Sequence, residues 1–364
     1  MTTASGTAEE TVDVVVVGGG PAGLSAAKIM ARSRRSVVVV DAGNGRNARA
    51  EGVHNYLYAE GTAPADLAEI GRSEARAYDV EIIEGHATTA TALRDPRPGA
   101  ARFTVDLRTG DGPGRTVGAR RVVLATGLVD VLPDVAGLAA RWGRDVLHCP
   151  FCHGWEVRDQ AIGVLGTSSM ALHQVMLFRQ LTTDVVYFQH TAPDPTDAEV
   201  EQLAAHGIEW IVGEVAAVQT SEDALTGVQL VDGRVVARQA LAVATGLEAR
   251  TDLLADLGLT TTELELGGIV AGHYLPTDPA GLTATPGVWA AGNIAAPMAQ
   301  VITSAAAGAG VGAAVHMDLI SEDTDIAVTA LRAQRESGSH PSSAAAEAED
   351  RGHVLVDRRH GATL

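Results

Sequence analysis

The feature that most restricts the fold of this chain is a group of glycines between two apolar segments near its start. Residues 14–17 are four consecutive valines, which is typical of a strand buried on both faces of a parallel sheet. The glycine-rich turn 18–23 follows, and residues 24–34 have the composition of a helix. A second apolar strand, 37–40, ends at Asp41. This order of elements predicts a βαβ unit of the dinucleotide-binding kind.

Each glycine of the Gly-x-Gly-x-x-Gly pattern has its own task in holding a pyrophosphate. Gly18 makes the turn, Gly20 lets backbone N–H groups approach the phosphates, and Gly23 lets the helix pack closely on the strand. Asp41 stands eighteen residues beyond Gly23, where it can accept a hydrogen bond from a ribose hydroxyl. The motif predicts nucleotide binding, but it does not separate FAD from NAD.

The same order of elements occurs a second time. Residues 161–165, 170–180 and 184–188 predict a strand, a helix and a strand, and each half of the chain is closed by an Ala-Thr-Gly segment, at 125–127 and at 244–246. Two similar halves predict the α/β class, with two Rossmann-like three-layer nucleotide-binding domains, the second inserted into the first.

The domain boundaries follow from these halves. We expect a discontinuous first domain of residues 1–147 and 272–330, an inserted domain of residues 148–271, and a flexible tail of residues 331–364. A helix of small residues is expected at about 299–319. Beyond it the sequence is polar with little apolar periodicity, which predicts a mobile tail with at most one short helix.

The charge and the cysteine content restrict the function. The formal net charge is −18, and Lys28 is the only lysine, which argues against nucleic acid and membrane surfaces as partners. Residues 1–13 lack the features of a signal peptide, so we expect a cytoplasmic protein. The only cysteines are Cys149 and Cys152, and in a reducing compartment such a pair indicates redox or metal chemistry.

The segment from His148 to His153 contains both cysteines in a Cys-x-x-Cys pattern. Two cysteines at a helix start can close a disulfide, and the helix terminus and nearby imidazoles lower a thiol pKa. Alternatives stay open: a zinc site formed by Cys149, Cys152, His148 and His153, a c-type haem attachment site, or an inert buried pair. The surrounding nucleotide-binding pattern favours the redox-active pair.

The layout resembles low-molecular-weight thioredoxin reductase over about residues 12–320. Residues 285–293 are similar to the second FAD motif of those flavoproteins, although Asn293 stands where an Asp is usual. The resemblance implies FAD as the cofactor and a homodimer. It also implies that Cys152 is the sulfur next to the flavin, and that Cys149 exchanges with the external thiol or disulfide.

The resemblance also implies the other site residues. His153 replaces the family's general-acid Asp and would deprotonate incoming thiols, with His148 beside it; a solvated histidine at a helix start is the alternative for both. A polar turn is the alternative reading for the loop residues at 46, 47 and 55. The residues implied to contact FAD are Gly18, Gly20, Pro21, Ala22, Gly23, Asp41, Arg46, Asn47, Asn55, Ala87, Ala125, Thr126, Gly127, Gly292, Asn293, Gln300 and Val301.

The inserted domain departs from the family where NADPH should bind. The middle glycine of the second nucleotide motif is replaced by Ser168, and the arginines that hold the 2′-phosphate would fall near His190 and Thr191. A neutral imidazole and a hydroxyl cannot clamp a phosphate dianion as two guanidinium groups do. We therefore do not expect reduction by NADPH, although a weak NADH site stays open.

Residues 41–48, 54–55 and 149–154, with the degraded NADPH motif, are similar to a subgroup of dithiol oxidases that close disulfides in natural products such as gliotoxin and holomycin. The similarity implies that a small-molecule dithiol reduces the Cys149–Cys152 disulfide and that electrons pass to FAD and then to O2, giving H2O2. The alternatives are a reductase of thioredoxin-like protein disulfides, fed by ferredoxin or an atypical nicotinamide site, and a non-catalytic redox-sensing protein.

Overall fold

The computed structural model of the chain describes residues 10–110 and 112–337. Its contacts divide the chain into a compact unit, Met1–Asp318, and a second unit that begins at Leu319. Both nucleotide-type domains belong to the first unit. Within the described residues, no helix is both long and apolar enough to span a bilayer.

The first domain is organised around a seven-stranded sheet. In spatial order its strands are β3 (Glu81–Glu84), β2 (Val37–Asp41), β1 (Glu10–Val17), β6 (Arg115–Leu124), β5 (Phe103–Arg108) and β4 (His86–Ala92), with β19 (Val288–Ala290) also paired to β6. The pairings among β3, β2, β1, β6 and β19 are parallel. Strand β5 pairs in antiparallel fashion with β6 on one side and with β4 on the other. Residues 14–17 are all buried, as the continuous valine run predicts.

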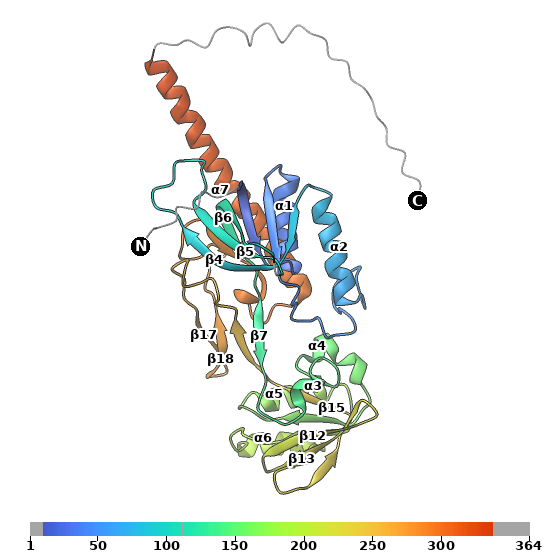
Figure 1. Cartoon of the computed structure of the whole chain (residues 1–364). Coiled ribbons are helices and arrows are strands. Elements are labelled where there is room, and N and C mark those ends of the chain that lie inside the picture. Colours follow the sequence, from blue (N-terminus) through green and yellow to red (C-terminus); the bar gives the residue numbers. More distant parts are fainter. Residues whose placement is uncertain (1–9, 111, 338–364) are drawn as a thin grey trace. The chain divides into compact units, whose positions relative to one another are not determined.

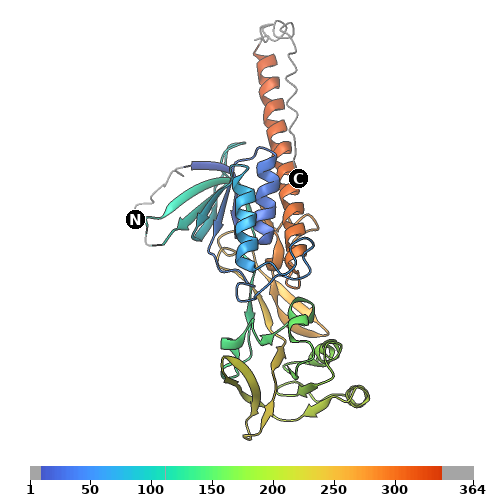
Figure 2. The ribbon, with the colours of Figure 1, turned by 90° about the vertical axis from the view of Figure 1, so that its right-hand side faces the viewer.

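Helices pack on one face of this sheet and a hydrophobic cluster covers the other. Helices α1 (Pro21–Arg32) and α2 (Pro64–Arg76) lie side by side (Figures 1 and 2). Pro21 stands in the first turn of α1, where its missing N–H would have no helical partner anyway. The cluster on the opposite face includes Leu253, Leu257 and Leu275.

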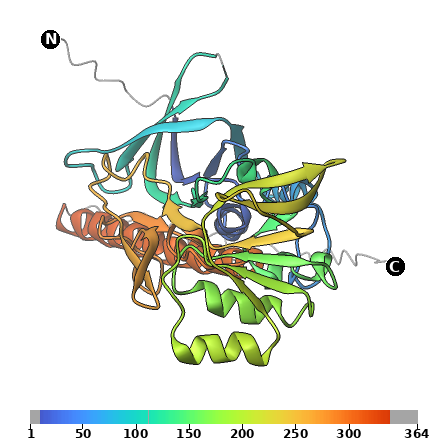
Figure 3. The ribbon, with the colours of Figure 1, turned by 90° about the horizontal axis from the view of Figure 1, so that it is seen from below.

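The second domain is also built in three layers. Its five-stranded parallel sheet contains β11 (Glu209–Ile211), β10 (Val185–Phe188), β9 (Ile162–Leu165), β15 (Ala240–Val243) and β8 (Val146–Leu147). One face packs on α5 (Ala171–Phe178) and α6 (Asp197–Ala205), which lie together in Figure 3. The other face packs on a small sheet of β12 (Val215–Ser221), β13 (Ala224–Leu230) and β14 (Val235–Ala237). The predicted α/β class with two Rossmann-like three-layer domains is confirmed.

Two connecting strands join the domains. The chain leaves the first domain through β7 (Leu128–Val131) and returns through the antiparallel β16 (Gly246–Ala249), and both belong to a four-stranded sheet with β17 (Thr262–Leu266) and β18 (Ile269–Tyr274). The remaining short helices are α3 (Leu138–Arg141), α4 (Pro150–His153), and the single 3-10 turns Trp155–Val157 and Gly292–Ile294.

The structure places the domain boundaries earlier than the expected positions at 148 and 272. Strand β8 already pairs with β15, and Val135 packs in the same core, so the inserted domain begins before residue 148. After β16 the chain packs its leucines, such as Leu253, into the first domain. The expectation failed because the two crossover strands are only four residues long and have no distinctive pattern.

Helix α7 (Val301–Glu336) is longer than expected. The sequence predicted that it would end near residue 319, with a tail from 331, but the helix continues to Glu336. Half of residues 321–336 are Ala, Leu, Arg or Glu, which have a high helix propensity. The segment forms a helix although it has no apolar periodicity. The rest of the expected tail, 338–364, lies outside the described residues.

Candidate active site

A single cavity of about 1050 Å³ extends from the glycine-rich turn to the cysteine pair. It brings together most of the residues that the sequence assigned to the site. The predicted residues that line it are Gly18, Gly20, Pro21, Ala22, Asp41, Arg46, Asn47, Ala87, Ala125, Thr126, Gly127, His148, Cys149, Cys152, His153, Gly292, Asn293, Gln300 and Val301. Gly23 and Asn55 were predicted to contact the cofactor but are not among the lining residues.

The glycine-rich turn has the close contacts that the motif predicts. Gly18 has a φ of 109°, and an ideal Cβ there would lie 2.2 Å from the carbonyl oxygen of Ala125. An ideal Cβ on Gly23 would lie 1.8 Å from the carbonyl oxygen of Gly18. Gly23 therefore serves helix packing rather than ligand contact, because its missing side chain faces the strand.

The space above the turn suits a dinucleotide. Among the described residues, no atom lies within 4 Å of an ideal Cβ on Gly20, which faces the cavity. Thr126 Oγ1, also at the cavity wall, is buried without a hydrogen-bond partner in the described part of the chain. An open cradle beside an unsatisfied hydroxyl fits a ligand with oxygen atoms, as FAD would supply.

Asn55 has a different role from the one predicted. Its Nδ2 donates a hydrogen bond to the carbonyl oxygen of Phe151, between the two cysteines, and its backbone N–H donates to Glu60 at 2.9 Å. Asn55 has a φ of 58°, a left-handed conformation that Asn tolerates better than most residues. Asn55 therefore holds the cysteine segment against the first domain instead of lining the cavity.

The cysteine pair stands at the start of α4. Cys149 precedes the helix, Cys152 lies within it, and their sulfur atoms are 2.6 Å apart. The two residues can therefore form a disulfide without a change of the fold. Gln300, the residue that precedes α7, donates a hydrogen bond from its Nε2 to the sulfur of Cys152 at 3.8 Å. Cys152 therefore faces the first domain.

The two thiols differ in acidity. The Cys152 thiol donates a hydrogen bond to Cys149 and the backbone N–H groups of residues 151 and 152 point at the same sulfur, which together lower the pKa of Cys149 to about 7 against the effect of burial. The pKa of Cys152 is raised, because it is the donor in that bond and is buried. Arg46 favours the thiolate form of both. In the reduced pair, Cys149 loses its proton first.

This difference predicts the pH dependence of alkylation. A pKa of about 7 means that Cys149 is half ionised near pH 7, and only the thiolate reacts with iodoacetamide. In the reduced protein, we expect alkylation of Cys149 to reach half its maximal rate near pH 7, ahead of Cys152. Peptide mass mapping after timed labelling identifies the modified residue. A midpoint for Cys149 above about 8.5, the value of an ordinary thiol, would contradict this assignment.

The two histidines that flank the pair have different surroundings. His148 Nδ1 lies 3.1 Å from the carbonyl oxygen of Val243, and burial is the main cause of its lowered pKa. That bond fixes the orientation of the ring, and within the described residues no group of three or more His, Cys, Asp or Glu side chains is placed to hold a metal ion. Burial also lowers the pKa of His153, so its ring is neutral near pH 7 and can accept a proton. His153 is therefore the better candidate for the base.

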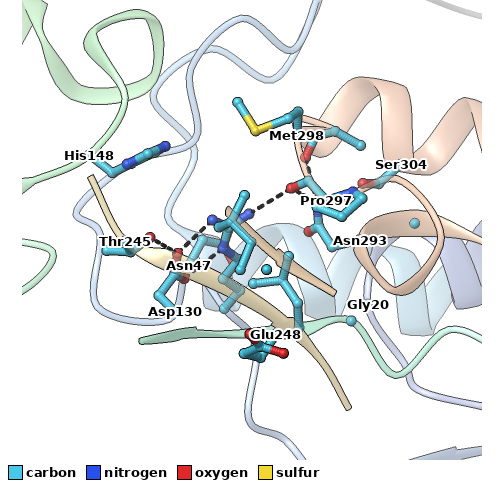
Figure 4. Close-up of a pocket in the computed structure, with 18 of the residues that line it drawn as sticks. Gly20, Asn47, Asp130, His148, Thr245, Glu248, Asn293, Pro297, Met298 and Ser304 are labelled. Atoms are coloured by element: carbon cyan, nitrogen blue, oxygen red, sulfur yellow. Dashed lines mark hydrogen bonds and ion pairs between the residues drawn. The ribbon is translucent and has the colours of Figure 1, made fainter. Parts of the chain in front are cut away.

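An ion pair that the sequence did not reveal lies in the same cavity (Figure 4). Arg46 contacts both carboxylate oxygens of Asp130 at 2.7 Å, and Thr245 Oγ1 donates to Asp130 at 2.9 Å. Burial disfavours the charge of Asp130, but these bonds hold its pKa below the ordinary value. Asp130 and Thr245 come from the two connections between the domains, so the pair joins those connections to the loop at residue 46. The repeated Ala-Thr-Gly segment was the only sequence signal for Thr245.

Asn293 also has a structural task. Its side-chain N–H2 group lies close to three backbone carbonyl oxygens, those of Ala296 at 3.3 Å, Pro297 at 3.1 Å and Ala299 at 2.8 Å. A carboxylate at this position could not donate these bonds. The amide therefore holds the loop that leads into α7, which accounts for Asn in place of the usual Asp.

Two residues of the degraded NADPH motif, His190 and Met170, make contacts within the chain itself. His190 Nδ1 accepts a hydrogen bond from the backbone N–H of Val215 at 3.0 Å, and burial lowers its pKa. The sulfur of Met170 packs against Gly267, where an ideal Cβ would lie only 2.5 Å from it. His190 is thus neutral and hydrogen-bonded to the backbone, so it does not replace a phosphate-binding arginine, and Met170 contacts the turn between β17 and β18.

Comparison with known proteins gives a consistent family. The family model for pyridine nucleotide-disulphide oxidoreductases matches residues 12–310. The protein "Thioredoxin reductase sirT" of Leptosphaeria maculans is 29% identical over 85% of this chain and 95% of its own length. The protein "Thioredoxin reductase tcpT" of Claviceps purpurea is 38% identical over 44% of this chain. The match spans about half (50%) of that relative.

A solved structure agrees with these relatives over most of the fold. The crystal structure of HlmI superposes with a TM-score of 0.78 and 39% sequence identity. The superposition covers 90% of this chain and 97% of HlmI. The similarity therefore extends over most of both nucleotide-type domains.

Proposed function

This chain belongs to the pyridine nucleotide-disulphide oxidoreductase family, and from that premise we propose that it is an FAD-dependent dithiol oxidase that closes an intramolecular disulfide in a small molecule. Bound FAD would accept two electrons from the cysteine pair and pass them to O2, giving H2O2. The glycine-rich turn, Asp41 and Gln300 would hold FAD in the cavity. The remaining steps belong to the side chains of the chain itself.

The two sulfurs have the arrangement that thiol–disulfide exchange needs. A substrate thiolate would attack Cys149 of the oxidised pair, and Cys152 would leave. The second substrate thiol would then attack the mixed disulfide and release Cys149, whose pKa of about 7 makes it a good leaving group. The position of Cys152 beside Gln300 supports its role as the sulfur that reacts with the flavin side.

The observation that carries the proposal is the loss of the phosphate-binding groups in the inserted domain, while the cysteine pair and the nucleotide-type turn of the first domain are both present. His190 bonds to the backbone of Val215, and Met170 packs against Gly267. A reductase needs NADPH or another donor to reduce its flavin, whereas an oxidase takes its electrons from the thiols. The loss of the phosphate-binding groups therefore supports electron flow from dithiol to flavin.

The lining near the cysteines supports a small substrate. Met170, His173 and Leu177 line the cavity together with Cys149, so a small, partly apolar molecule can reach the sulfur within the fold. The net charge of −18 offers no evident attraction for an acidic protein partner. A compact dithiol fits these surroundings better than a folded protein does.

The proposal predicts which donor reduces the flavin. Under anaerobic conditions, dithiothreitol is expected to bleach the flavin absorbance within seconds. NADPH at the same concentration should bleach it at least about a hundredfold more slowly, because the phosphate clamp is absent. Admission of air should restore the absorbance and produce one H2O2 for each dithiol oxidised. Rapid bleaching by NADPH would return the protein to the reductases.

A second candidate is a reductase of protein disulfides, and one observation favours it. Phe151 lies between the two cysteines and Trp155 follows them, and their side chains are 65% and 66% exposed, as residues that dock a protein often are. Enzyme whose flavin has been reduced by dithionite should then reduce the disulfide of a thioredoxin in a stoichiometric anaerobic reaction. The dithiol oxidase should leave that disulfide intact.

A further inference from the structure

A group of charged side chains lies beside the cysteine pair and has no role in the steps above. His54 Nδ1 lies 2.6 Å from Glu60, and His54 Nε2 lies 3.3 Å from Glu156. His54 lines the cavity and its side chain is 23% exposed, whereas that of Glu60 is 66% exposed. The His54 imidazole therefore connects Glu156, which lies next to the cysteine segment, to the solvent-exposed carboxylate of Glu60.

The group reaches the cysteines through His153. Glu156 follows His153 by three residues and lies in the helical turn after α4, and its negative charge acts on the His153 ring. The loop that carries His54 and Glu60 is held against the same segment by the hydrogen bond from Asn55 to the Phe151 carbonyl. These side chains come from two domains, and both Glu156 and His54 act electrostatically on the His153 ring.

We propose that Glu156, His54 and Glu60 form a proton path that carries the protons of the substrate thiols from His153 to solvent. This inference rests on the proposed dithiol oxidation and assigns a task to residues that it did not use. His153 meets the substrate and is the catalytic base. The other three act through it, so they are positioning and proton-transfer residues.

The number of protons follows from the exchange chemistry. The first substrate thiol gives up its proton, and its sulfur bonds to Cys149 while the Cys149–Cys152 bond breaks. The second thiol gives up its proton, and its sulfur bonds to the first while Cys149 leaves. The substrate loses two electrons to the cysteine pair and two protons to the base. O2 later takes up two electrons and two protons, on the flavin side of the pair.

The imidazole between two carboxylates is suited to this transfer. A neutral ring carries a proton on one nitrogen and a lone pair on the other, so a proton accepted at Nε2 from Glu156 can be matched by one released at Nδ1 to Glu60. The charged groups around the ring are Glu60 and Glu156 at its nitrogens, His153 near it, and Glu51 near His153. Three carboxylates therefore offset the positive charge that passes through the two rings.

The test is a first-turnover measurement with dithiothreitol as the probe. Oxidised holoenzyme is mixed anaerobically with dithiothreitol, and both the flavin absorbance and the oxidised dithiothreitol in quenched samples are recorded between pH 6 and pH 9. His54→Gln and Glu156→Gln keep side chains that can hydrogen-bond but cannot relay a proton. Both variants should be about tenfold to a hundredfold slower at pH 7.

The pH profile separates proton transfer from a structural role. At pH 9 a much larger fraction of the probe is ionised in solution and needs no base, so the difference between the variants and the wild type should shrink. Added imidazole buffer should partly rescue them at pH 7. The matched control is Glu74→Gln, which removes the carboxylate of α2 that forms an exposed ion pair with Lys28 of α1. This variant should keep wild-type rates at every pH.

Three results would overturn the inference. Variants with wild-type rates at pH 7 would leave no role for the path. Variants slowed equally at every pH and without imidazole rescue would show that His54 only clamps the segment. A wild-type enzyme whose flavin and probe do not react at all would overturn the proposed function, and the proton path with it.

Discussion

Replacement of either cysteine by serine is expected to abolish the proposed dithiol oxidation, with a loss of at least about a thousandfold in kcat/KM. A hydroxyl cannot form the mixed disulfide, and Cys149 and Cys152 are the only cysteines of the chain, so no other thiol can replace the missing one. The double variant should lose no more than each single variant, because the two sulfurs act as one unit. H2O2 release with dithiothreitol as the substrate measures the effect.

The two single variants should differ in how they trap a thiol. Cys152→Ser leaves Cys149, whose sulfur faces the substrate side, and it should form a stable mixed disulfide with an activated disulfide reagent. Cys149→Ser leaves Cys152 behind the side chain of Gln300, where the same reagent should react more slowly. Dithionite reduction and reoxidation by air are the controls, since both variants should retain them. Turnover above about one per cent of wild type in either variant would remove the pair from the mechanism.

The Gly308→Ala variant is expected to lose FAD and to unfold at a lower temperature, with a loss of at least about 3 kcal/mol in stability. An ideal Cβ at Gly308 in α7 would lie 2.0 Å from the carbonyl oxygen of Ala22, in the first turn of α1. The clash is with backbone at the glycine-rich turn, so no side-chain rotation can relieve it. The flavin content of the purified protein and its thermal unfolding midpoint report the effect.

The matched control lies two residues further along the same helix. Among the described residues, no atom lies within 4 Å of an ideal Cβ on Gly310. Gly310→Ala should therefore stabilise the helix by up to about 1 kcal/mol, because Ala loses less backbone freedom than Gly. Equal effects of the two substitutions would show that helix propensity, rather than the contact with Ala22, decides the outcome.

Much of the fold was predictable because local signals agreed with one another. The valine run, the glycines and Asp41 each indicated the first βαβ unit, and the structure has that unit. The small-residue composition of 299–319 indicated a closely packed helix, and Gly308 shows why, since only a glycine lets α7 reach the backbone of α1. Such contacts leave a sequence signal because a single residue type satisfies them.

The domain boundaries and the end of α7 were predicted less well. Strand β7 has four residues of mixed exposure, and nothing in its sequence shows that it pairs with β16 more than a hundred residues later. The helix beyond residue 319 lacks the apolar stripe on which a periodicity argument depends, but its composition still favours helix. Local sequence patterns do not show which distant strands pair, and they do not mark a helix that has high helix propensity but no apolar stripe.

The sequence by itself determined the family resemblance, the nucleotide-type turn, the cysteine pair and the loss of the phosphate-binding residues, because each is a short pattern of residue types with a direct physical meaning. The tertiary structure decided what surrounds the pair. It placed Gln300 on Cys152, set Asn55 against Phe151 and brought His54 between Glu60 and Glu156. Apart from the contact of His54 with Glu60, these contacts join segments from different domains, and only the packing of one domain against the other fixes which side chains meet.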